Sequence, residues 1–251
     1  MTDSTERFSS RVENYIRYRP HYPPGVIDVL RDGCGLTSHA IVADIGSGTG
    51  ILSQLFLANG NTVLGVEPNS AMRHAAESLL TTEVRFQSIK GTAEGTGLPD
   101  GCADFVTAGQ AFHWFDRHEA QREFKRILKP SGWVVLVWNE RSLAASSFGT
   151  AYEQLLMEFA TDYEAVNQRS MSAQALAEFF TNGFSSRTMA NSQHFDFDGL
   201  QGRLLSSSYA PEVGHRKYEA MITALRSVFD AHQVDGNVIF EYDTNVYYGR
   251  L

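Results

Sequence analysis

"VADIGSGTGILSQLF", residues Val42–Phe56, leads from an apolar strand through three alternating glycines into a helical pattern. Gly46, Gly48 and Gly50 allow the chain to turn sharply and a ligand to approach the backbone. The helix that follows would present backbone N–H groups that have no partner within the helix. The stretch therefore predicts a strand, a ligand-binding turn and a helix in direct succession.

Short apolar runs alternate with helical patterns on both sides of this stretch, from Ile41 to Asn139. We expect strands at Ile41–Ile45, Thr62–Val66, Val84–Ser88, Ala103–Ala108 and Gly132–Trp138. Helices fill the gaps: Asn69 or Ser70 would cap one, and Asp116 with Glu119 would form a capping box at the start of another. Such alternation is typical of βαβ units and predicts a doubly wound parallel sheet.

The pattern changes after Asn139. Helical patterns at Phe148–Phe159 and Ala173–Phe180 follow each other without a strong strand between them, which suggests a lid. A weaker strand signal over residues 183–197 precedes more helix at residues 198–208 and 214–231. The last fifteen residues, 237–251, are rich in β-branched and aromatic side chains and predict a long final strand.

Composition limits the possible functions. The chain of 251 residues carries a formal net charge of -8, which argues against a protein that neutralises a run of phosphates. Cys34 and Cys102 fit neither a metal-site spacing nor a disulfide framework. The N-terminus has no apolar targeting segment, and Trp133–Trp138 is too short to span a bilayer. We expect a soluble cytoplasmic protein, monomeric or homodimeric, without a metal, nucleic acid or membrane partner.

The glycine turn is not typical of a phosphate-binding turn. Ile51 stands where the third glycine of a G-x-G-x-x-G pattern should be, and no P-loop sequence follows. Asp44, just before the turn, would repel a pyrophosphate and suits a cationic ligand. Glu67 ends the second strand, where an acidic side chain accepts hydrogen bonds from ribose hydroxyls. An adenosyl ligand with a sulfonium and an ammonium group meets both conditions, although Glu67 by itself would suit NAD equally well.

Three further segments carry a family resemblance: "AEGTGLP" (Ala93–Pro99), "AFHWF" (Ala111–Phe115) and "YIRYRPHYP" (Tyr15–Pro23). Together with the glycine turn they resemble class I S-adenosylmethionine-dependent methyltransferases of the small-molecule type, including the trans-aconitate methyltransferase-like group. The first segment is longer than the compact form of that pattern. The resemblance extends over nearly the whole chain.

The resemblance implies S-adenosylmethionine as cofactor and S-adenosylhomocysteine as product. The glycine turn would pass under the methionine part, Glu67 would hold the ribose, and Pro68 or Met72 would pack on adenine. The full set of implied cofactor-binding positions is Asp44, Gly46, Ser47, Gly48, Glu67, Pro68, Met72, Ala93, Glu94, Gln110 and Ala111. The last two would lie beside the transferable methyl group.

Which residues would act on the methyl acceptor depends on the chemistry of the transfer, to which correct positioning of the reactants contributes most. An acceptor that starts protonated needs a base, for which His113 is the best-placed candidate. A carboxylate acceptor needs a cation instead, which Arg19, Arg141 or Arg203 could supply. Hydroxyl, amine and carbon acceptors also remain open. His113 and Trp114 could equally be packing residues. Arg19 and Tyr209 are expected, with His113, to be catalytic residues, and together with Ser206 to line the acceptor pocket.

The expected fold is α/β: a doubly wound, Rossmann-like, seven-stranded, mostly parallel sheet with an antiparallel final strand and a helical lid. We expect a helical cover segment at residues 1–35, the cofactor-binding core at 36–142, a lid and substrate region at 143–236 and the final strand at 237–251. The leading hypothesis is a methyltransferase for a small-molecule acceptor. An NAD-dependent oxidoreductase and a non-catalytic protein that binds an adenosyl ligand are the alternatives.

Overall fold

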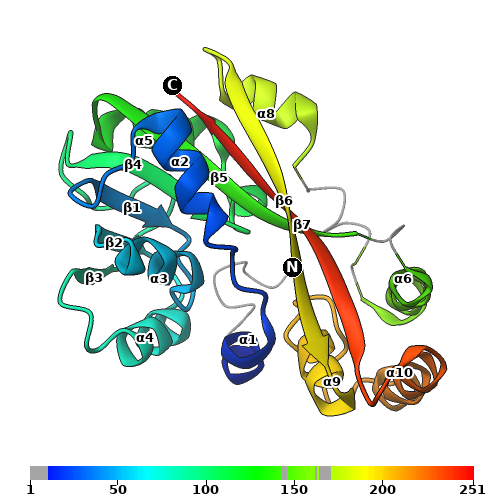
Figure 1. Cartoon of the computed structure of the whole chain (residues 1–251). Coiled ribbons are helices and arrows are strands. Elements are labelled where there is room, and N and C mark those ends of the chain that lie inside the picture. Colours follow the sequence, from blue (N-terminus) through cyan, green and yellow to red (C-terminus); the bar gives the residue numbers. More distant parts are fainter. Residues whose placement is uncertain (1–10, 143–145, 162, 164–170) are drawn as a thin grey trace.

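Seven strands form a single sheet in the order β3-β2-β1-β4-β5-β7-β6 (Figure 1). The computed structural model describes residues 11–142, 146–161, 163 and 171–251. The strands are β1 (Ile41–Ile45), β2 (Thr62–Val66), β3 (Phe86–Ile89), β4 (Ala103–Gly109), β5 (Leu128–Arg141), β6 (Phe184–Phe195) and β7 (Val238–Gly249). The first five strands pair in parallel, whereas β7 is antiparallel to both β5 and β6. The predicted fold class is confirmed.

The strands differ in how closely they match the sequence prediction. β1 and β2 have the predicted bounds, and β7 covers most of the predicted final strand. The predicted start of the third strand at Val84 is wrong, because the strand begins at Phe86 and the Val84 side chain is 95% exposed. An apolar residue in a connecting turn was thus counted as part of a strand.

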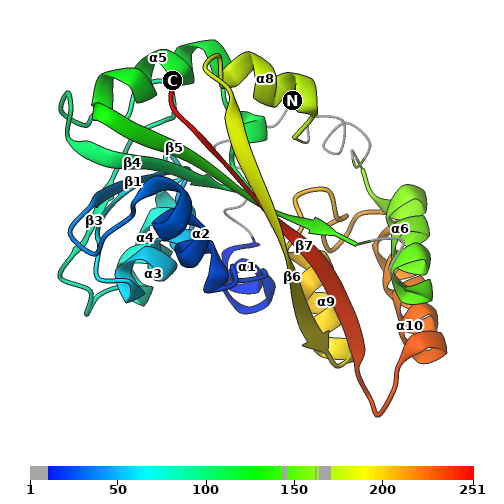
Figure 2. The ribbon, with the colours of Figure 1, turned by 45° about the horizontal axis from the view of Figure 1, so that its top comes forward.

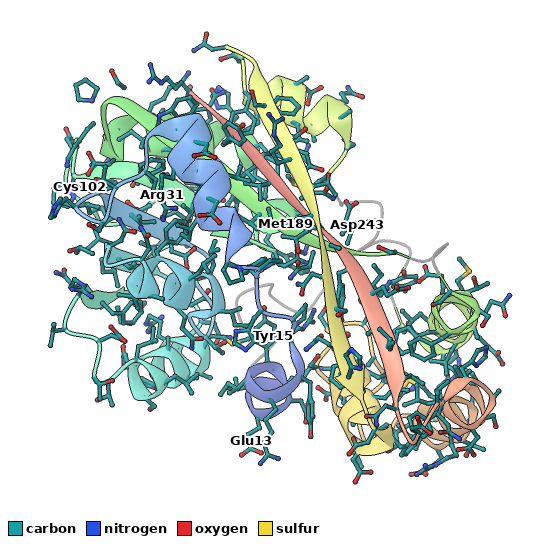
Figure 3. The ribbon with its side chains drawn as sticks, in the orientation of Figure 1. Glu13, Tyr15, Arg31, Cys102, Met189 and Asp243 are labelled. Atoms are coloured by element: carbon teal, nitrogen blue, oxygen red, sulfur yellow. The ribbon has the colours of Figure 1, made fainter. Side chains whose placement is uncertain are left out.

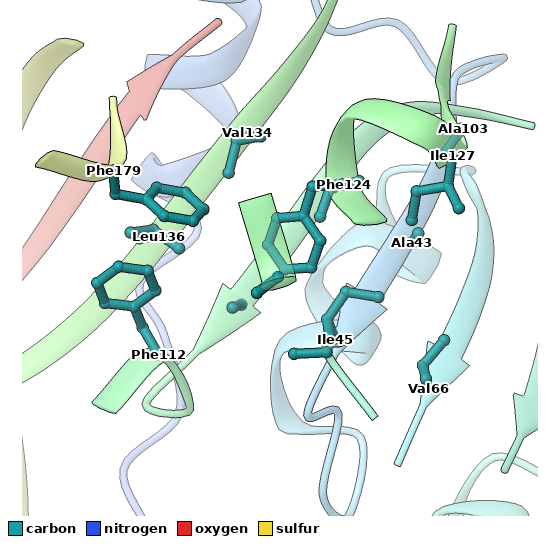
Figure 4. Close-up of a cluster of buried hydrophobic side chains, with 14 of the residues drawn as sticks. Ala43, Ile45, Val66, Ala103, Phe112, Phe124, Ile127, Val134, Leu136 and Phe179 are labelled. Carbon is teal, nitrogen blue, oxygen red and sulfur yellow. The ribbon is translucent and has the colours of Figure 1, made fainter. Parts of the chain in front are cut away.

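Helices cover both faces of the sheet. Those described are α1 (Val12–Tyr18), α2 (Gly25–Cys34), α3 (Ile51–Ala58), α4 (Ser70–Leu79), α5 (Arg117–Ile127), α6 (Ser147–Phe159), α8 (Ala173–Phe179), α9 (Phe197–Leu205) and α10 (Tyr218–His232). On one face α2 and α3 bury Leu30 and Phe56 against the strands. On the other, Phe124 of α5 and Phe179 of α8 pack with Leu136 of β5 (Figure 4). These two apolar layers hold the sheet as a rigid platform.

A third apolar cluster forms where β6 and β7 continue past the parallel strands. Figure 2 shows this antiparallel pair of strands extending to α9, α6 and α10. Tyr152 of α6, Leu204 of α9, Leu225 of α10 and Phe240 of β7 are buried together there. No helix in the described part of the chain has the length and apolar character needed to cross a membrane.

Two expected helix starts are observed, one of them with a different partner. Asn69 caps α4 by accepting a hydrogen bond from the Met72 N–H. Asp116 caps α5, but the expected capping box is wrong, since the Asp116 N–H donates to Glu94 at 2.8 Å and not to Glu119. The loop after β3 therefore supplies the carboxylate that a capping box would have taken from the helix itself.

The segment expected to form the lid is divided between two places. Within the described residues of 143–182, α6 packs in the third apolar cluster, with α9, α10 and β7. Leu176 and Phe179 of α8 belong instead to the core beside the sheet. Helix α8 thus covers the sheet, contrary to the expectation that it closes over the ligand site. Residues 1–10, 143–145, 162 and 164–170, which the predicted cover and lid also included, lie outside the described residues.

Candidate functional site

A pocket of about 420 Å³ opens at the carboxyl ends of β1, β4 and β5, which is where doubly wound sheets bind ligands. Helix α1 lies across this region, and Figure 3 shows Tyr15 on the side of α1 that faces the sheet, with Glu13 on the opposite side. Of the positions implied for the cofactor, the pocket is lined by Gly46, Gly48, Glu67, Pro68, Met72, Ala93, Glu94, Gln110 and Ala111. Asp44 and Ser47 line a small adjoining cavity.

The glycine turn is fixed from β2. The N–H groups of Gly46 and Ser47 both donate to the Val66 carbonyl, at 2.8 and 3.1 Å. The Gly48 N–H donates to one oxygen of Glu67 at 3.0 Å, and the other oxygen accepts from the Asn69 N–H at 2.8 Å. Burial raises the pKa of Glu67. The carboxylate is therefore held in place at the edge of the pocket.

Asp44 is fully buried at the end of β1. It accepts hydrogen bonds from the hydroxyls of Ser53, at 2.7 Å, and Thr107, at 3.3 Å, so that it joins β1 to α3 and β4. Burial raises its pKa to about 6, although both hydrogen bonds act in the opposite direction. The expected contact of Asp44 with a cationic ligand stays a prediction, and its observed bonds are structural.

Gln110 stands at the end of β4 with a backbone φ of 53°, in the left-handed region that non-glycine residues seldom occupy. Its side-chain oxygen accepts a hydrogen bond from the Asn139 N–H at 2.7 Å, and so ties the end of β4 to that of β5. Strained residues of this kind gather at ligand sites, where the surrounding structure holds them. Gln110 therefore has a fixed position on the pocket wall.

One wall of the pocket is aromatic. The His113 ring lies 4.4 Å from the Trp114 ring and 5.2 Å from the Trp138 ring, measured between centroids, and all three residues line the pocket. This arrangement combines the two readings of the sequence, because His113 both packs against aromatic rings and faces the site. Trp138 was not predicted as a site residue, since its position inside an apolar run suggested only core packing.

The opposite end of the pocket is polar. It is formed by Arg19, Arg141, Tyr163, Arg203, Ser208 and Tyr209. Arg141 donates to the Tyr209 hydroxyl at 3.0 Å, to Glu153 at 3.1 Å and to the Tyr163 hydroxyl. Arg203 donates to the Tyr242 hydroxyl at 3.1 Å. The three arginines that the sequence offered as alternatives thus share one end of the same pocket.

Arg19 also connects α1 to the end of α9. Its guanidinium donates to the Ser206 carbonyl at 2.9 Å, and burial together with nearby Arg203 lowers its pKa. The expectation that Ser206 lines the pocket is wrong, because this residue is fully buried and its hydroxyl donates to the Arg203 carbonyl at 2.7 Å. Ser208, two residues further along, lines the pocket instead.

Comparisons with known proteins agree with this arrangement. Residues 43–136 match the "Methyltransferase domain" family. An uncharacterized methyltransferase of Mycobacterium bovis is 37% identical over 139 residues, which are 55% of this chain and 54% of the relative. The chain therefore spans about half the length of the curated relatives that it matches.

Solved structures show the same fold. A putative type II methyltransferase from Anaeromyxobacter dehalogenans superposes with a TM-score of 0.64 at 19% identity, over 93% of this chain and 98% of that one. A phosphoethanolamine N-methyltransferase of Haemonchus contortus, solved with S-adenosylhomocysteine, gives 0.55 at 15% identity, over 96% and 56%. These comparisons do not support the NAD-dependent alternative. Residues 43–136 of the chain match the methyltransferase domain family, and the chain has the fold of these methyltransferase structures.

Proposed function

We propose that this protein transfers a methyl group from S-adenosylmethionine to a small-molecule acceptor and releases S-adenosylhomocysteine. The observation that carries the proposal is one pocket that is lined at one end by the glycine turn and Glu67 and elsewhere by Arg141 and Tyr209, with Arg19 and Arg203 also lining the small cavity beside the glycine turn. Its volume of about 420 Å³ is in the range of small-molecule sites. The bound cofactor would supply a methyl group activated by its attachment to a sulfonium.

The residues at the first end suit this cofactor. A Cβ atom added to Gly48 would meet nothing within 4 Å, so the backbone there is open to close approach. Each Glu67 oxygen accepts a backbone hydrogen bond and has a further lone pair for a ribose hydroxyl. We assign the adenine to Pro68, Met72, Ala93 and Glu94, and the methionine part to Asp44, Gly46, Ser47, Gly48, Gln110 and Ala111.

The rest of the pocket would orient the acceptor and exclude water. Tyr15 and Arg19, on and just after α1, cover it from one side, while His113 and Trp114 form the aromatic wall. Holding two reactants in line is the main contribution that a protein makes to such a transfer. His113 remains a candidate base for an acceptor that starts protonated.

Calorimetric titration tests the cofactor, with S-adenosylmethionine and NAD compared on the same protein. We expect binding of the first and none of the second. Release of S-adenosylhomocysteine is then measured over a panel of carboxylic acids, phenols, alcohols and amines. Binding without release from any member of the panel would favour the non-catalytic alternative, and binding of NAD alone would overturn the proposal.

A further inference from the structure

The Tyr209 hydroxyl lies within a cluster of positive charge. Arg141 at the end of β5 donates to it at 3.0 Å, and Arg203 of α9 and Arg19 after α1 line the same end of the pocket. Among the described residues, the carboxylate paired with this cluster is that of Glu153, which contacts Arg141 at 3.1 Å. Three guanidinium groups thus share one carboxylate, and an additional negative charge would be stabilised here.

Most donors of Arg141 and Arg203 are committed to oxygens of the protein. Both terminal nitrogens of Arg141 donate, one to Tyr209 and the other to Glu153 and Tyr163. Arg203 donates through Nε to Tyr242 and through Nη1 to Ser207. The fork of Arg141 is therefore not open for bidentate capture of a carboxylate from the pocket. Arg141 is thus arranged around Tyr209 more than around an acceptor anion.

We propose that Tyr209 is a catalytic residue whose phenolate oxygen accepts the proton of a hydroxyl acceptor during methyl transfer. This inference rests on the proposed function. The proton moves from the acceptor hydroxyl to Tyr209 Oη, the electron pair of that O–H bond forms the bond to the methyl carbon, and the pair of the methyl–sulfur bond stays on the sulfur. Tyr209 then returns its proton to solvent.

The surroundings of Tyr209 support ionisation at moderate pH. Burial acts to raise the pKa of its hydroxyl, but Arg141, Arg203, a hydrogen bond with Ser207 and Arg19 together outweigh burial and lower the pKa to about 8. The other groups facing it are Glu153, Tyr152, Tyr163, whose ring lies 5.0 Å from that of Tyr209, and Tyr242. Burial raises the pKa of Tyr22, Tyr152, Tyr163 and Tyr247, so these tyrosines ionise later.

The acceptor class follows from this base. Proton transfer is most effective between groups of similar pKa, and an ordinary phenol has a pKa of about 10. A phenolic or enolic hydroxyl is thus a better match than an alkyl alcohol. The same guanidinium groups would stabilise the acceptor oxygen as its proton leaves.

Tyrosine ionisation can be followed directly by near-ultraviolet absorbance during a pH titration of the whole protein. We expect one tyrosine to ionise about 100-fold more readily than an ordinary one, with a midpoint near pH 8. Tyr209→Phe should lack this early step, whereas Tyr163→Phe, which removes the neighbouring hydroxyl, should keep it. The absence of an early step in the wild type, or its persistence in Tyr209→Phe, would overturn the proposal.

A second measurement connects ionisation to transfer and needs only the phenols of the acceptor panel. We expect the wild-type rate to rise with pH through about 8, and Tyr209→Phe to be slower by about 100-fold or more. Tyr247→Phe, outside the pocket, is the matched control. Transfer confined to carboxylic acids, or a Tyr209→Phe rate equal to wild type, would overturn the base while leaving the proposed function intact. Failure of the wild-type protein to bind S-adenosylmethionine would instead overturn the proposed function.

Discussion

Glu67 accepts a hydrogen bond from the backbone N–H of Gly48 at 3.0 Å, which ties the end of β2 to the glycine turn after β1. The second oxygen of the same carboxylate accepts from the Asn69 N–H at 2.8 Å, just before α4. One side chain therefore holds two segments of the pocket wall. The shape of the turn depends on Glu67 before any ligand binds, so Glu67 has a structural part as well as the proposed part in binding.

Glu67→Ala should affect both stability and binding. The buried Asn69 N–H and the partly buried Gly48 N–H would lose their acceptor, so we expect the free energy of unfolding to fall by about 1–3 kcal/mol. The free energy of S-adenosylmethionine binding should weaken by about 1–3 kcal/mol as well. Denaturant unfolding and calorimetry measure the two effects separately. Glu67→Gln is the control that keeps one acceptor oxygen, and undiminished affinity in the alanine variant would refute the ribose assignment.

Gly46 and Gly48 both have positive φ values, 68° and 57°, but they should respond differently to alanine. A Cβ at Gly46 would lie 2.6 Å from that of Ala111, whereas a Cβ at Gly48 would meet nothing within 4 Å. Both variants carry the backbone strain of a left-handed alanine, about 1 kcal/mol. We expect Gly46→Ala to lose more unfolding free energy, and Gly48→Ala to lose cofactor affinity with a smaller loss of stability. Equal stability losses in the two variants would contradict this prediction.

The fold was predictable where packing follows directly from the sequence. β1 and β2 are buried parallel strands, so each is mostly apolar, and the predicted bounds hold. The sequence signal for β6 is weak, because eight of its twelve residues are exposed at the edge of the sheet. An edge strand has fewer apolar positions, and its length is set by pairing with β7 along its whole course.

The two ends of the site were not equally predictable. The cofactor end is built from residues that directly follow the strands, so sequence position alone assigns them to one edge of the sheet. The polar end combines residues from distant segments, such as Arg19, Tyr163 and Tyr209, and no sequence spacing relates them. Ser206 and Ser208 illustrate the limit, because only the observed end of α9 determines which of them faces the pocket.

Asp44 should make stability depend on pH. Its pKa in the folded protein is about 6, raised from the ordinary value of 3.8 chiefly by burial. The folded state therefore holds the proton of Asp44 more tightly than the unfolded state does. The contribution of Asp44 to stability is greatest below pH 3.8 and is lost as pH rises from there through about 6. The contribution of this one group is about 3 kcal/mol at most.

Asp44→Asn removes the titrating group and keeps an oxygen that can accept from Ser53. Denaturant unfolding of both proteins from pH 4 to pH 7 isolates the effect, because other titrating groups cancel in the difference. We expect the variant to gain stability relative to wild type as pH rises through this range. Curves that stay parallel would show that the Asp44 carboxylate has an ordinary pKa in the folded protein.

The last prediction concerns how α1 is held over the pocket. Arg11 donates to the carbonyls of Ser207, at 2.6 Å, and Ala210, at 2.8 Å, just beyond α9. Between α1 and α9 themselves, the Tyr18 ring occupies the space above Gly202, where an added Cβ would lie only 2.0 Å from the ring. Gly202→Ala should therefore displace α1. Because Arg19 follows α1 and lines the pocket, we expect methyl transfer to fall as well.

Gly25→Ala in α2 is the matched control, because a Cβ there would lie 3.4 Å from the Met189 sulfur, an ordinary contact. Replacing a helical glycine by alanine stabilises a helix by about 1 kcal/mol when there is room for it. We therefore expect Gly25→Ala to gain stability and Gly202→Ala to lose it. Hydrogen exchange of the α1 amides should be faster in Gly202→Ala only. If α1 stayed equally protected in both variants, the contact between Tyr18 and Gly202 would not be what holds this helix over the site.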